Sequence, residues 1–233
     1  MLLAGALAPA PPPLADFVEP DLLAEMPANT ASLLARLPDA DLYLQDEVHF
    51  TLHPTLTRLW CRKGRRGQRL IEAPGQNETT YGFGLVDWRD GWFDGRLAPG
   101  RTAAAFCGQV RTAVARSQAR GRGAVVLCDN LRTHTAAGSK LVRQMLVELE
   151  GQVHLVYTPA YDPDANRIEW LWRVSRRAVT HNHQRRDFAT LCADAEAHFR
   201  DLAAHPDAVL AHIGSPGLPE HADPIAQPLA HAA

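Results

Sequence analysis

The sequence predicts an α/β domain in which helices cover a mixed β-sheet. Segments with a hydrophobic period of two come first and indicate a series of hairpin strands. Segments with a helical period then alternate with short apolar strands, which is typical of a layered α/β domain. The length of 233 residues suits one such domain with extensions at its ends.

The elements follow one another in a clear order. Strands are expected over residues 41–50, 81–87, 92–97, 124–129 and 154–157, with basic strand-like segments over 59–72. Helices are expected over residues 102–116, 136–149, 168–180 and 188–203. Residues 1–40 contain seven of the 17 prolines and are expected to form an irregular arm. Residues 213–233 are expected to form a disordered tail, which leaves residues 41–212 as the folded domain.

Composition excludes several classes of protein. The four cysteines form no Cys-x-x-Cys pair, so neither a disulfide framework nor a zinc site is expected, and a cytosolic location follows. No segment is expected to be a signal peptide or to enter a membrane. Although the net charge is −2, residues 58–212 hold 23 basic and 16 acidic side chains. This basic middle suits an anionic polymer as partner, and the alternative is that its arginines only solvate the surface.

Asp46 occupies an unusual position in the first strand. The period of two places it in the apolar row with Leu42, Leu44, Val48 and Phe50. An ionised carboxylate there is costly unless a cation or several hydrogen-bond donors meet it, so Asp46 requires a partner. The alternative is that twist or a bulge turns its side chain to solvent.

Two further carboxylates stand at the ends of elements. Asp129 closes a short apolar strand, and the carboxyl end of such a strand is where open α/β sheets place ligand groups. A helix or turn cap before Thr133 is the alternative for Asp129. Glu169 lies in the first turn of a helix, where the helix dipole favours an acid, and its spacing from Asn166 is also that of a capping box.

The segments around these acids form three motifs. They read Leu44-Gln45-Asp46-Glu47, then Leu127-Cys128-Asp129-Asn130 with His134, then Tyr161-x-Pro163-Asp164-x-Asn166-x-Ile168-Glu169-x-x-Trp172. Together they resemble the catalytic domain of bacterial insertion-sequence transposases of the mariner superfamily (the insertion sequence six-thirty family), a branch of the DDE superfamily endonucleases. The resemblance covers about residues 41–203, and its third motif is the most specific.

The resemblance implies a ribonuclease-H-like fold, with a mixed five-stranded sheet and helices on both faces. It also implies that Asp46, Asp129 and Glu169 are catalytic and bind two Mg²⁺ or Mn²⁺ ions for cleavage and strand transfer at transposon ends. Hard oxygen ligands favour these ions over zinc. Two features depart from the family. Arg167 stands where proline is usual, and the spacing from Asp129 to Glu169 is long, so that counting alone would nominate Asp164.

Double-stranded DNA, both transposon ends and target, is the partner that the resemblance implies. The residues expected to contact its phosphates are Arg62, Lys63, Arg65, Arg66, Arg173, Arg176, Arg177 and His134. For each arginine an ordinary solvated surface position is the alternative, as is a loop or surface position for His134.

Transposases of this kind place helix-turn-helix modules ahead of the catalytic domain, and residues 1–40 are too short and proline-rich to hold them. We therefore expect the second half of a split transposase, acting with a separate helix-turn-helix-bearing chain, or a truncated remnant. A homodimer and a nucleoid-associated location in a bacterial cytoplasm are further expectations. The competing functions are a catalytically idle remnant that binds DNA or an intact transposase, and another ribonuclease-H-like nuclease.

Overall fold

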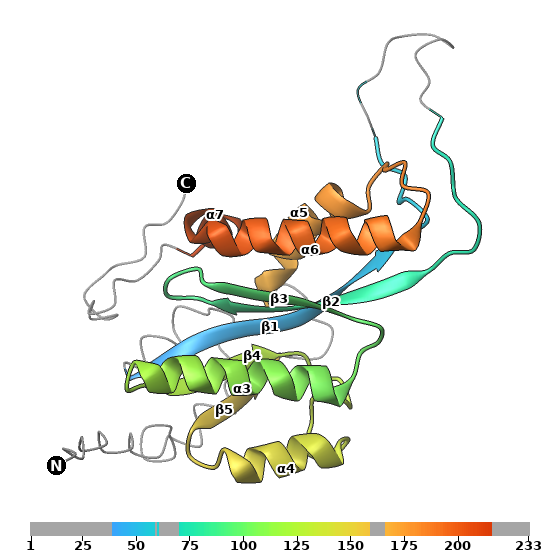
Figure 1. The fold of residues 1–233 in the computed structure, drawn as a ribbon. Coiled ribbons are helices and arrows are strands. Elements are labelled where there is room, and N and C mark those ends of the chain that lie inside the picture. Colours follow the sequence, from blue (N-terminus) through green and yellow to red (C-terminus); the bar gives the residue numbers. More distant parts are fainter. Residues whose placement is uncertain (1–38, 59, 61–69, 159–165, 216–233) are drawn as a thin grey trace, which may run out of the picture.

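The computed structural model describes residues 39–58, 60, 70–158 and 166–215, and one five-stranded sheet lies at the centre of this part (Figure 1). The strands are β1 (Ala40–Thr51), β2 (Thr79–Asp87), β3 (Phe93–Ala98), β4 (Gly123–Cys128) and β5 (Val153–Tyr157). The helices are α3 (Ala103–Ala119), α4 (Lys140–Glu148), α5 (Ile168–Val179), α6 (Phe188–Ala204) and α7 (Pro206–Ile213).

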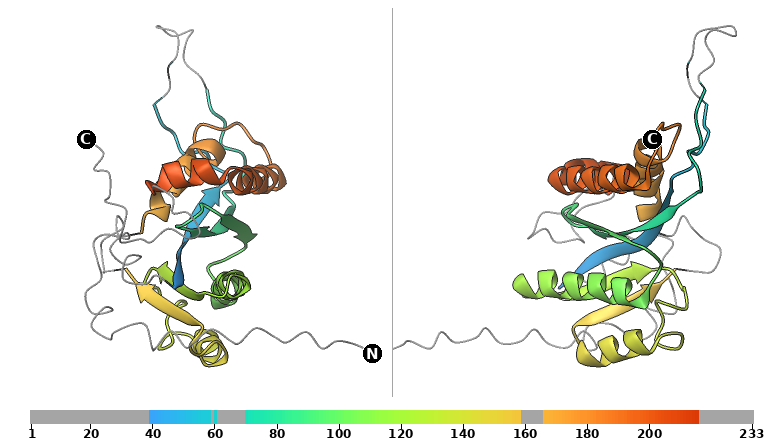
Figure 2. Two further views of the ribbon diagram at one scale, coloured as in Figure 1. Left: turned by 90° about the vertical axis from the view of Figure 1, so that its left-hand side faces the viewer. Right: turned by 45° about the vertical axis from the view of Figure 1, so that its right-hand side comes forward.

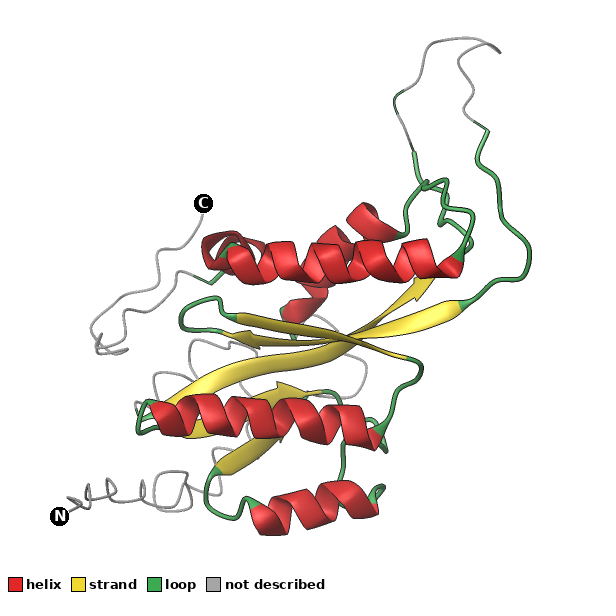
Figure 3. Ribbon diagram, viewed as in Figure 1, coloured by secondary structure: helices red, strands yellow, loops and turns green. Residues whose placement is uncertain are grey.

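The sheet is mixed and has the order β3-β2-β1-β4-β5. The strand β1 pairs antiparallel with β2 and parallel with β4. Toward the two edges of the sheet, β2 pairs antiparallel with β3, and β4 pairs parallel with β5. Helices α3 and α4 cover one face, and α5, α6 and α7 cover the other (Figures 2 and 3). The mixed five-stranded sheet with helices on both faces is therefore confirmed.

Alternation along β1 separates two hydrophobic cores. Leu42, Leu44, Val48 and Phe50 are buried in the core under α5, α6 and α7. Tyr43, on the opposite face, is buried in the core under α3 and α4. Each fully buried large apolar side chain contributes about 1.5–3 kcal/mol to folding. The predicted apolar row of β1 is thus the row that receives α5, and this places Asp46 beneath that helix.

Glycine in β2 leaves room for an aromatic ring that descends from α5. Gly84 lies opposite Asp46 in the pairing of β1 and β2. A Cβ added at Gly84 would lie only 2.2 Å from Cη2 of Trp172. The absence of a side chain at this position therefore allows the indole of Trp172 to approach the sheet beside Asp46.

Replacing Gly84 by Ala should lower the free energy of unfolding by about 1–3 kcal/mol, because the added methyl group displaces the Trp172 ring or the backbone of β2. Gly108 in α3 is a matched control, since nothing lies within 4 Å of a Cβ added there. Gly108→Ala should raise stability by up to about 1 kcal/mol through helix propensity. Urea denaturation measures both changes, and an equal loss in the two variants would refute the steric explanation.

A buried network of ion pairs fixes the start of β1 to the end of α3. Asp41 and Asp87 are fully buried. Nη2 of Arg120 lies 2.8 Å from Oδ2 of Asp41 and 2.5 Å from Oδ2 of Asp87. Nε of Arg122 lies 2.7 Å from Oδ1 of Asp41. Removing one partner would leave a buried charge uncompensated, so the network holds β1 in a defined position against α3.

Two helices differ from the sequence expectation. The helix expected over 136–149 begins later, at Lys140, because Oγ of Ser139 accepts a hydrogen bond from the Val142 amide and caps the helix there. The helix α7 was not expected as a separate element. Pro206 starts it immediately after α6, and Gly214, with a φ of 66°, ends it.

Where it is described, the chain between β1 and β2 extends away from the body of the domain (Figure 1). Of the strand-like segments expected over 59–72, residues 60 and 70–72 form no strand, and the others lie outside the described residues. The expected arm and tail lie almost wholly outside them as well. None of the described helices is long and apolar enough to cross a membrane.

Candidate active site

Asp46 lies in the middle of β1 on the face covered by α5. Its Oδ2 accepts a hydrogen bond from Nε1 of Trp172 at 3.0 Å. Burial, followed by repulsion from Glu169 and from Glu47 and Asp129, raises the pKa of Asp46 to about 8. The carboxyl group is therefore held close enough to other carboxylates for their charges to oppose its ionisation. The alternative that its side chain turns freely to solvent is wrong.

Asp129 follows the last residue of β4. Leu44 of β1 pairs with Leu127 of β4, and the same parallel register, continued by two residues, brings Asp46 beside Asp129. Oδ1 of Asp129 accepts a hydrogen bond from the Leu131 amide at 3.2 Å, so the side chain does cap a turn. Its side chain is nevertheless 41% exposed. Asp129 can thus cap the turn and still be accessible to a ligand.

Glu169 lies in the first turn of α5, and Asn166 sets the position of that turn. Nδ2 of Asn166 donates to the carbonyl oxygen of Gln45 at 2.8 Å, and Oδ1 accepts from the Ile168 amide at 3.4 Å. The capping box does not form, because the cap residue is Arg167 and makes no side-chain cap bond. Asn166 instead ties the start of α5 to β1 next to Asp46, and this brings Glu169 toward it.

In the described part of the third motif, from Asn166 onward, the structure gives a physical reason for the recurring residues. Asn166 fixes the helix start, buried Ile168 anchors it in the core, and Trp172 reaches Asp46 one turn after Glu169. Arg167, the departure from the family pattern, also has a contact of its own. Its Nη1 donates to the carbonyl oxygen of Gly214 at 3.1 Å, which joins α5 to the end of α7.

His134 lies in the turn after β4, as the loop alternative expected, but its side chain is buried and not on the surface. The ring is 1% exposed and lies between two carboxylates, with Nδ1 2.5 Å from Oδ1 of Asp129 and Nε2 2.9 Å from Oε1 of Glu47. Both ring nitrogens are occupied, so the ring has none left for a DNA phosphate. Burial alone would lower the pKa of His134, but its hydrogen bonds to Asp129 and Glu47 raise it to about 9.

Two residues near the carboxylates were missed by the sequence analysis. Glu47 was noted only as part of the first motif. Arg101, just before α3, lies in no motif that would have marked it as a site residue. Burial raises the pKa of Asp129. The hydrogen bond from His134 and smaller effects, which include the charge of Arg101, together outweigh burial, so the pKa is lowered overall. Burial lowers the pKa of His49, and the charges of Arg176 and then Arg101 lower it further. Positive charge therefore lies around the acidic residues.

The basic residues expected to contact DNA are only partly within the described chain. Arg62, Lys63, Arg65 and Arg66 lie outside the described residues, as does Asp164. Arg173 and Arg177 are exposed on α5. Nη2 of Arg176 lies 3.5 Å from Oε2 of Glu169, so this arginine contacts an acid of the candidate site directly.

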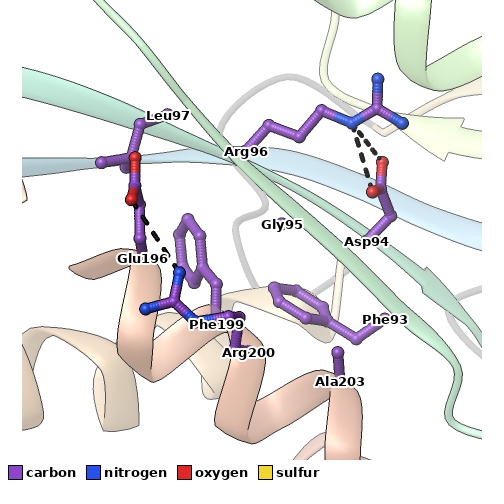
Figure 4. Close-up of a pocket in the computed structure, with 9 residues that line it drawn as sticks. All are labelled: Phe93, Asp94, Gly95, Arg96, Leu97, Glu196, Phe199, Arg200 and Ala203. Carbon is purple, nitrogen blue, oxygen red and sulfur yellow. Dashed lines mark hydrogen bonds and ion pairs between the residues drawn. The ribbon is translucent and has the colours of Figure 1, made fainter. Parts of the chain in front are cut away.

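A separate pocket of about 400 Å³ lies between β3 and α6 (Figure 4). Phe93 and Phe199 contribute its apolar surface. The charged groups on its rim are paired, Arg96 with Asp94 at 2.9 Å and Arg200 with Glu196 at 3.9 Å. The pocket includes none of the three candidate carboxylates, so it is distinct from the candidate active site.

Comparison with known proteins identifies relatives of the whole domain. The family model for the DDE superfamily endonuclease matches residues 41–192. The "Insertion element IS630 uncharacterized 39 kDa protein" of Shigella sonnei is 25% identical over 143 residues, which cover 61% of this chain and 40% of that protein. The solved Mos1 mariner paired end complex with Mg gives a TM-score of 0.51 at 14% identity, and the complex with Mn gives 0.50 at 13%. Both comparisons cover 92% of this chain and 65% of the Mos1 chain.

The chain thus spans two-fifths of the length of the curated relative and about two-thirds of the Mos1 chains. At these low identities the structural likeness concerns the fold, which is ribonuclease-H-like as the resemblance implied. The family model covers well over half of the sequence and includes all three candidate carboxylates. The chain therefore belongs to the DDE superfamily of endonucleases.

Proposed function

We propose that this chain is the catalytic domain of a DNA transposase, which cleaves and joins phosphodiester bonds at transposon ends with Asp46, Asp129 and Glu169 as its catalytic residues. The observation that carries the proposal is the environment of Asp46. Its carboxyl group is half-buried in an otherwise apolar row, and the charges of Glu169 and Asp129 oppose its ionisation. A fold gains nothing from this repulsion, so the arrangement calls for a cation that binds all three groups.

The donor set fits Mg²⁺ or Mn²⁺. The three side chains offer only carboxylate oxygens, which are the ligands these hard cations favour. The Mos1 structures described as complexes with Mg and with Mn have the same fold, which supports the same choice here. We propose two ions. When bound, such a pair supplies activation of a water or 3′-hydroxyl and stabilises the leaving oxygen during in-line displacement at phosphorus.

The protein's own contribution is to hold the three carboxylates in place before DNA arrives. Trp172 donates its indole N–H to Asp46, and Asn166 ties the start of α5 to β1. Arg176, 3.5 Å from Glu169, partly balances its charge. Because strands and a helix rather than loops carry Asp46 and Glu169, the ligand geometry is set largely by the fold.

We expect the proposed DNA surface to include Arg101 and Arg176, whose charges act on His49 next to the site. Arg101→Ala should weaken DNA binding and reduce the slope of log affinity against log salt by about one, because one fewer counterion is released. Arg143→Ala, on α4, which covers the face of the sheet opposite α5, is the matched control and should leave the slope unchanged (Figure 1). Equal slopes for wild type and Arg101→Ala would exclude a phosphate contact.

A cleavage assay tests the proposal directly. The substrates are duplex DNA with the terminal repeats that flank the source element, scrambled duplex DNA and an RNA–DNA hybrid, each with Mg²⁺ or Mn²⁺. Metal-dependent nicking of duplex DNA, absent from the variant with all three acids replaced by amides, supports the transposase. Cleavage of the hybrid alone would favour another nuclease of this fold, and DNA binding without cleavage would favour an idle remnant.

Sequence recognition is proposed to come from a separate helix-turn-helix-bearing chain, with a homodimer as the working assembly. Phosphate contacts alone position DNA without specifying sequence. A nucleoid-associated location in a bacterial cytoplasm would follow from DNA as the substrate.

A further inference from the structure

Asp129, one of the three proposed metal ligands, is linked through a buried histidine to a fourth carboxylate that is not in the triad. His134 is 1% exposed, and its ring nitrogens face Asp129 at 2.5 Å and Glu47 at 2.9 Å. The ring stacks on Phe106, with centroids 4.2 Å apart and an interplanar angle of 19°. The hydroxyl of Tyr157 donates to the backbone carbonyl of His134 at 3.1 Å. Three contacts thus fix the position and plane of this ring, and a fourth holds the backbone that carries it.

The far carboxylate of the link is itself held. Glu47 follows Asp46 in β1, so its side chain lies on the opposite face of the sheet from Asp46. Its side chain is 2% exposed, and Oε1 also accepts a hydrogen bond from Nε2 of Gln45 at 3.2 Å. Gln45 in turn donates to Gln109 of α3 at 3.3 Å. A chain of hydrogen bonds therefore connects α3 and β1 to His134.

The link determines which oxygen of Asp129 is free. Oδ1 accepts from both the His134 ring and the Leu131 amide. Among the described residues no hydrogen bond engages Oδ2 of Asp129, and the side chain is 41% exposed. With Oδ1 fixed by two donors, the carboxylate cannot rotate, and Oδ2 remains as the oxygen available to a ligand.

We propose that Glu47 and His134 are positioning residues, which hold Asp129 so that Oδ2 is presented to the catalytic metal while neither of them binds metal or DNA. The proposal rests on the function proposed above for Asp129. Partners of metal ligands commonly change metal affinity by 10–100-fold when they are removed, because they fix the orientation of the ligand. Both partners of His134 can only accept hydrogen bonds, so the ring must donate from both nitrogens.

Two amide substitutions separate the two halves of the link. In His134→Asn the side-chain N–H₂ can occupy the place of Nδ1 and still donate to Asp129, while the contact with Glu47 is lost. In His134→Gln the amide can occupy the place of Nε2 and reach Glu47, while the contact with Asp129 is lost. Both variants lose the stacking ring on Phe106, so a merely structural role predicts equal effects on every property.

The readout is Mn²⁺ binding to the full chain, measured by electron paramagnetic resonance, with thermal unfolding recorded for each variant. We expect His134→Gln to weaken Mn²⁺ binding about tenfold or more and His134→Asn to weaken it only a few-fold, at similar melting temperatures. Equal weakening in both variants would reduce His134 to a structural residue. Unchanged binding in both would remove it from the site altogether.

Two further variants distinguish this proposal from the function on which it rests. Glu47, Asp129 and His134 offer ligand atoms within 4.8 Å of one another, so they could bind a metal themselves. If Asp46→Asn leaves Mn²⁺ binding intact while Glu47→Gln abolishes it, the metal binds at that cluster and both proposals are overturned. If Asp46→Asn abolishes binding while the two His134 variants behave alike, the metal site stands and only the positioning role fails.

Discussion

Replacing Glu169 by Gln should reduce metal-dependent DNA cleavage by about a thousandfold or more, equivalent to roughly 4 kcal/mol of transition-state stabilisation. Gln keeps the size and helix propensity of Glu but lacks the charge that attracts a divalent cation. Folding should be little affected, because the side chain is only partly buried at the first turn of α5. Single-turnover cleavage in Mg²⁺ with matched circular dichroism spectra measures both effects.

Asp164→Asn is the matched control, since sequence spacing alone would nominate Asp164 as the third acid. The contacts of Asn166 and Trp172 align the helix with β1 and favour Glu169 instead. Cleavage by Asp164→Asn should remain within a few-fold of the wild type. Loss of cleavage in Asp164→Asn together with retention in Glu169→Gln would show that Asp164 is the third acid.

Replacing Asp46 by Asn should stabilise the metal-free protein at neutral pH while abolishing cleavage. The pKa of Asp46 is raised from 3.8 to about 8 by burial and by neighbouring acids, Glu169 foremost. Between these values the native state binds more protons than the unfolded state, so stability falls as the pH rises from about 4 to 8. One pKa unit corresponds to about 1.4 kcal/mol, so the penalty at pH 7 is of the order of a few kcal/mol.

Asn removes this penalty and can still accept the hydrogen bond from Trp172. In EDTA the variant should melt about 5–10 °C above the wild type at pH 7.5, and the two should converge near pH 4. Calorimetry across this pH range measures the difference. A variant that is less stable than the wild type at pH 7.5 would mean that the carboxylates near Asp46 do not repel one another as described.

The alternation of apolar residues was sufficient to predict which face of β1 receives which helices. Because a strand has a period of two, Leu42, Leu44, Val48 and Phe50 had to share one face, and Asp46 was recognisable as the exception. The motif around Asn166 and Glu169 identified the family. The sequence could not distinguish a capping box from a tie to β1, because that depends on which backbone lies opposite Asn166.

Long-range pairings were beyond what sequence could give. Glu47 and His134 meet only because β1 and β4 are neighbours in the sheet, so no local pattern joins them. The pairing of Asp41 with Arg120 and Arg122 depends on the path of α3 in the same way. By contrast, the separate helix α7 did have a local signal in Pro206, which suits the first turn of a new helix.

Anomalous diffraction from crystals of the full chain grown with Mn²⁺ would locate the bound metal directly. We predict two Mn²⁺ ions about 3.5–4 Å apart, with carboxylate oxygens of Asp46, Asp129 and Glu169 as their ligands. His134 and Glu47 should stay hydrogen-bonded to each other and away from the metal. Mn²⁺ bound instead by Glu47, Asp129 and His134, with Asp46 and Glu169 out of contact, would contradict this prediction.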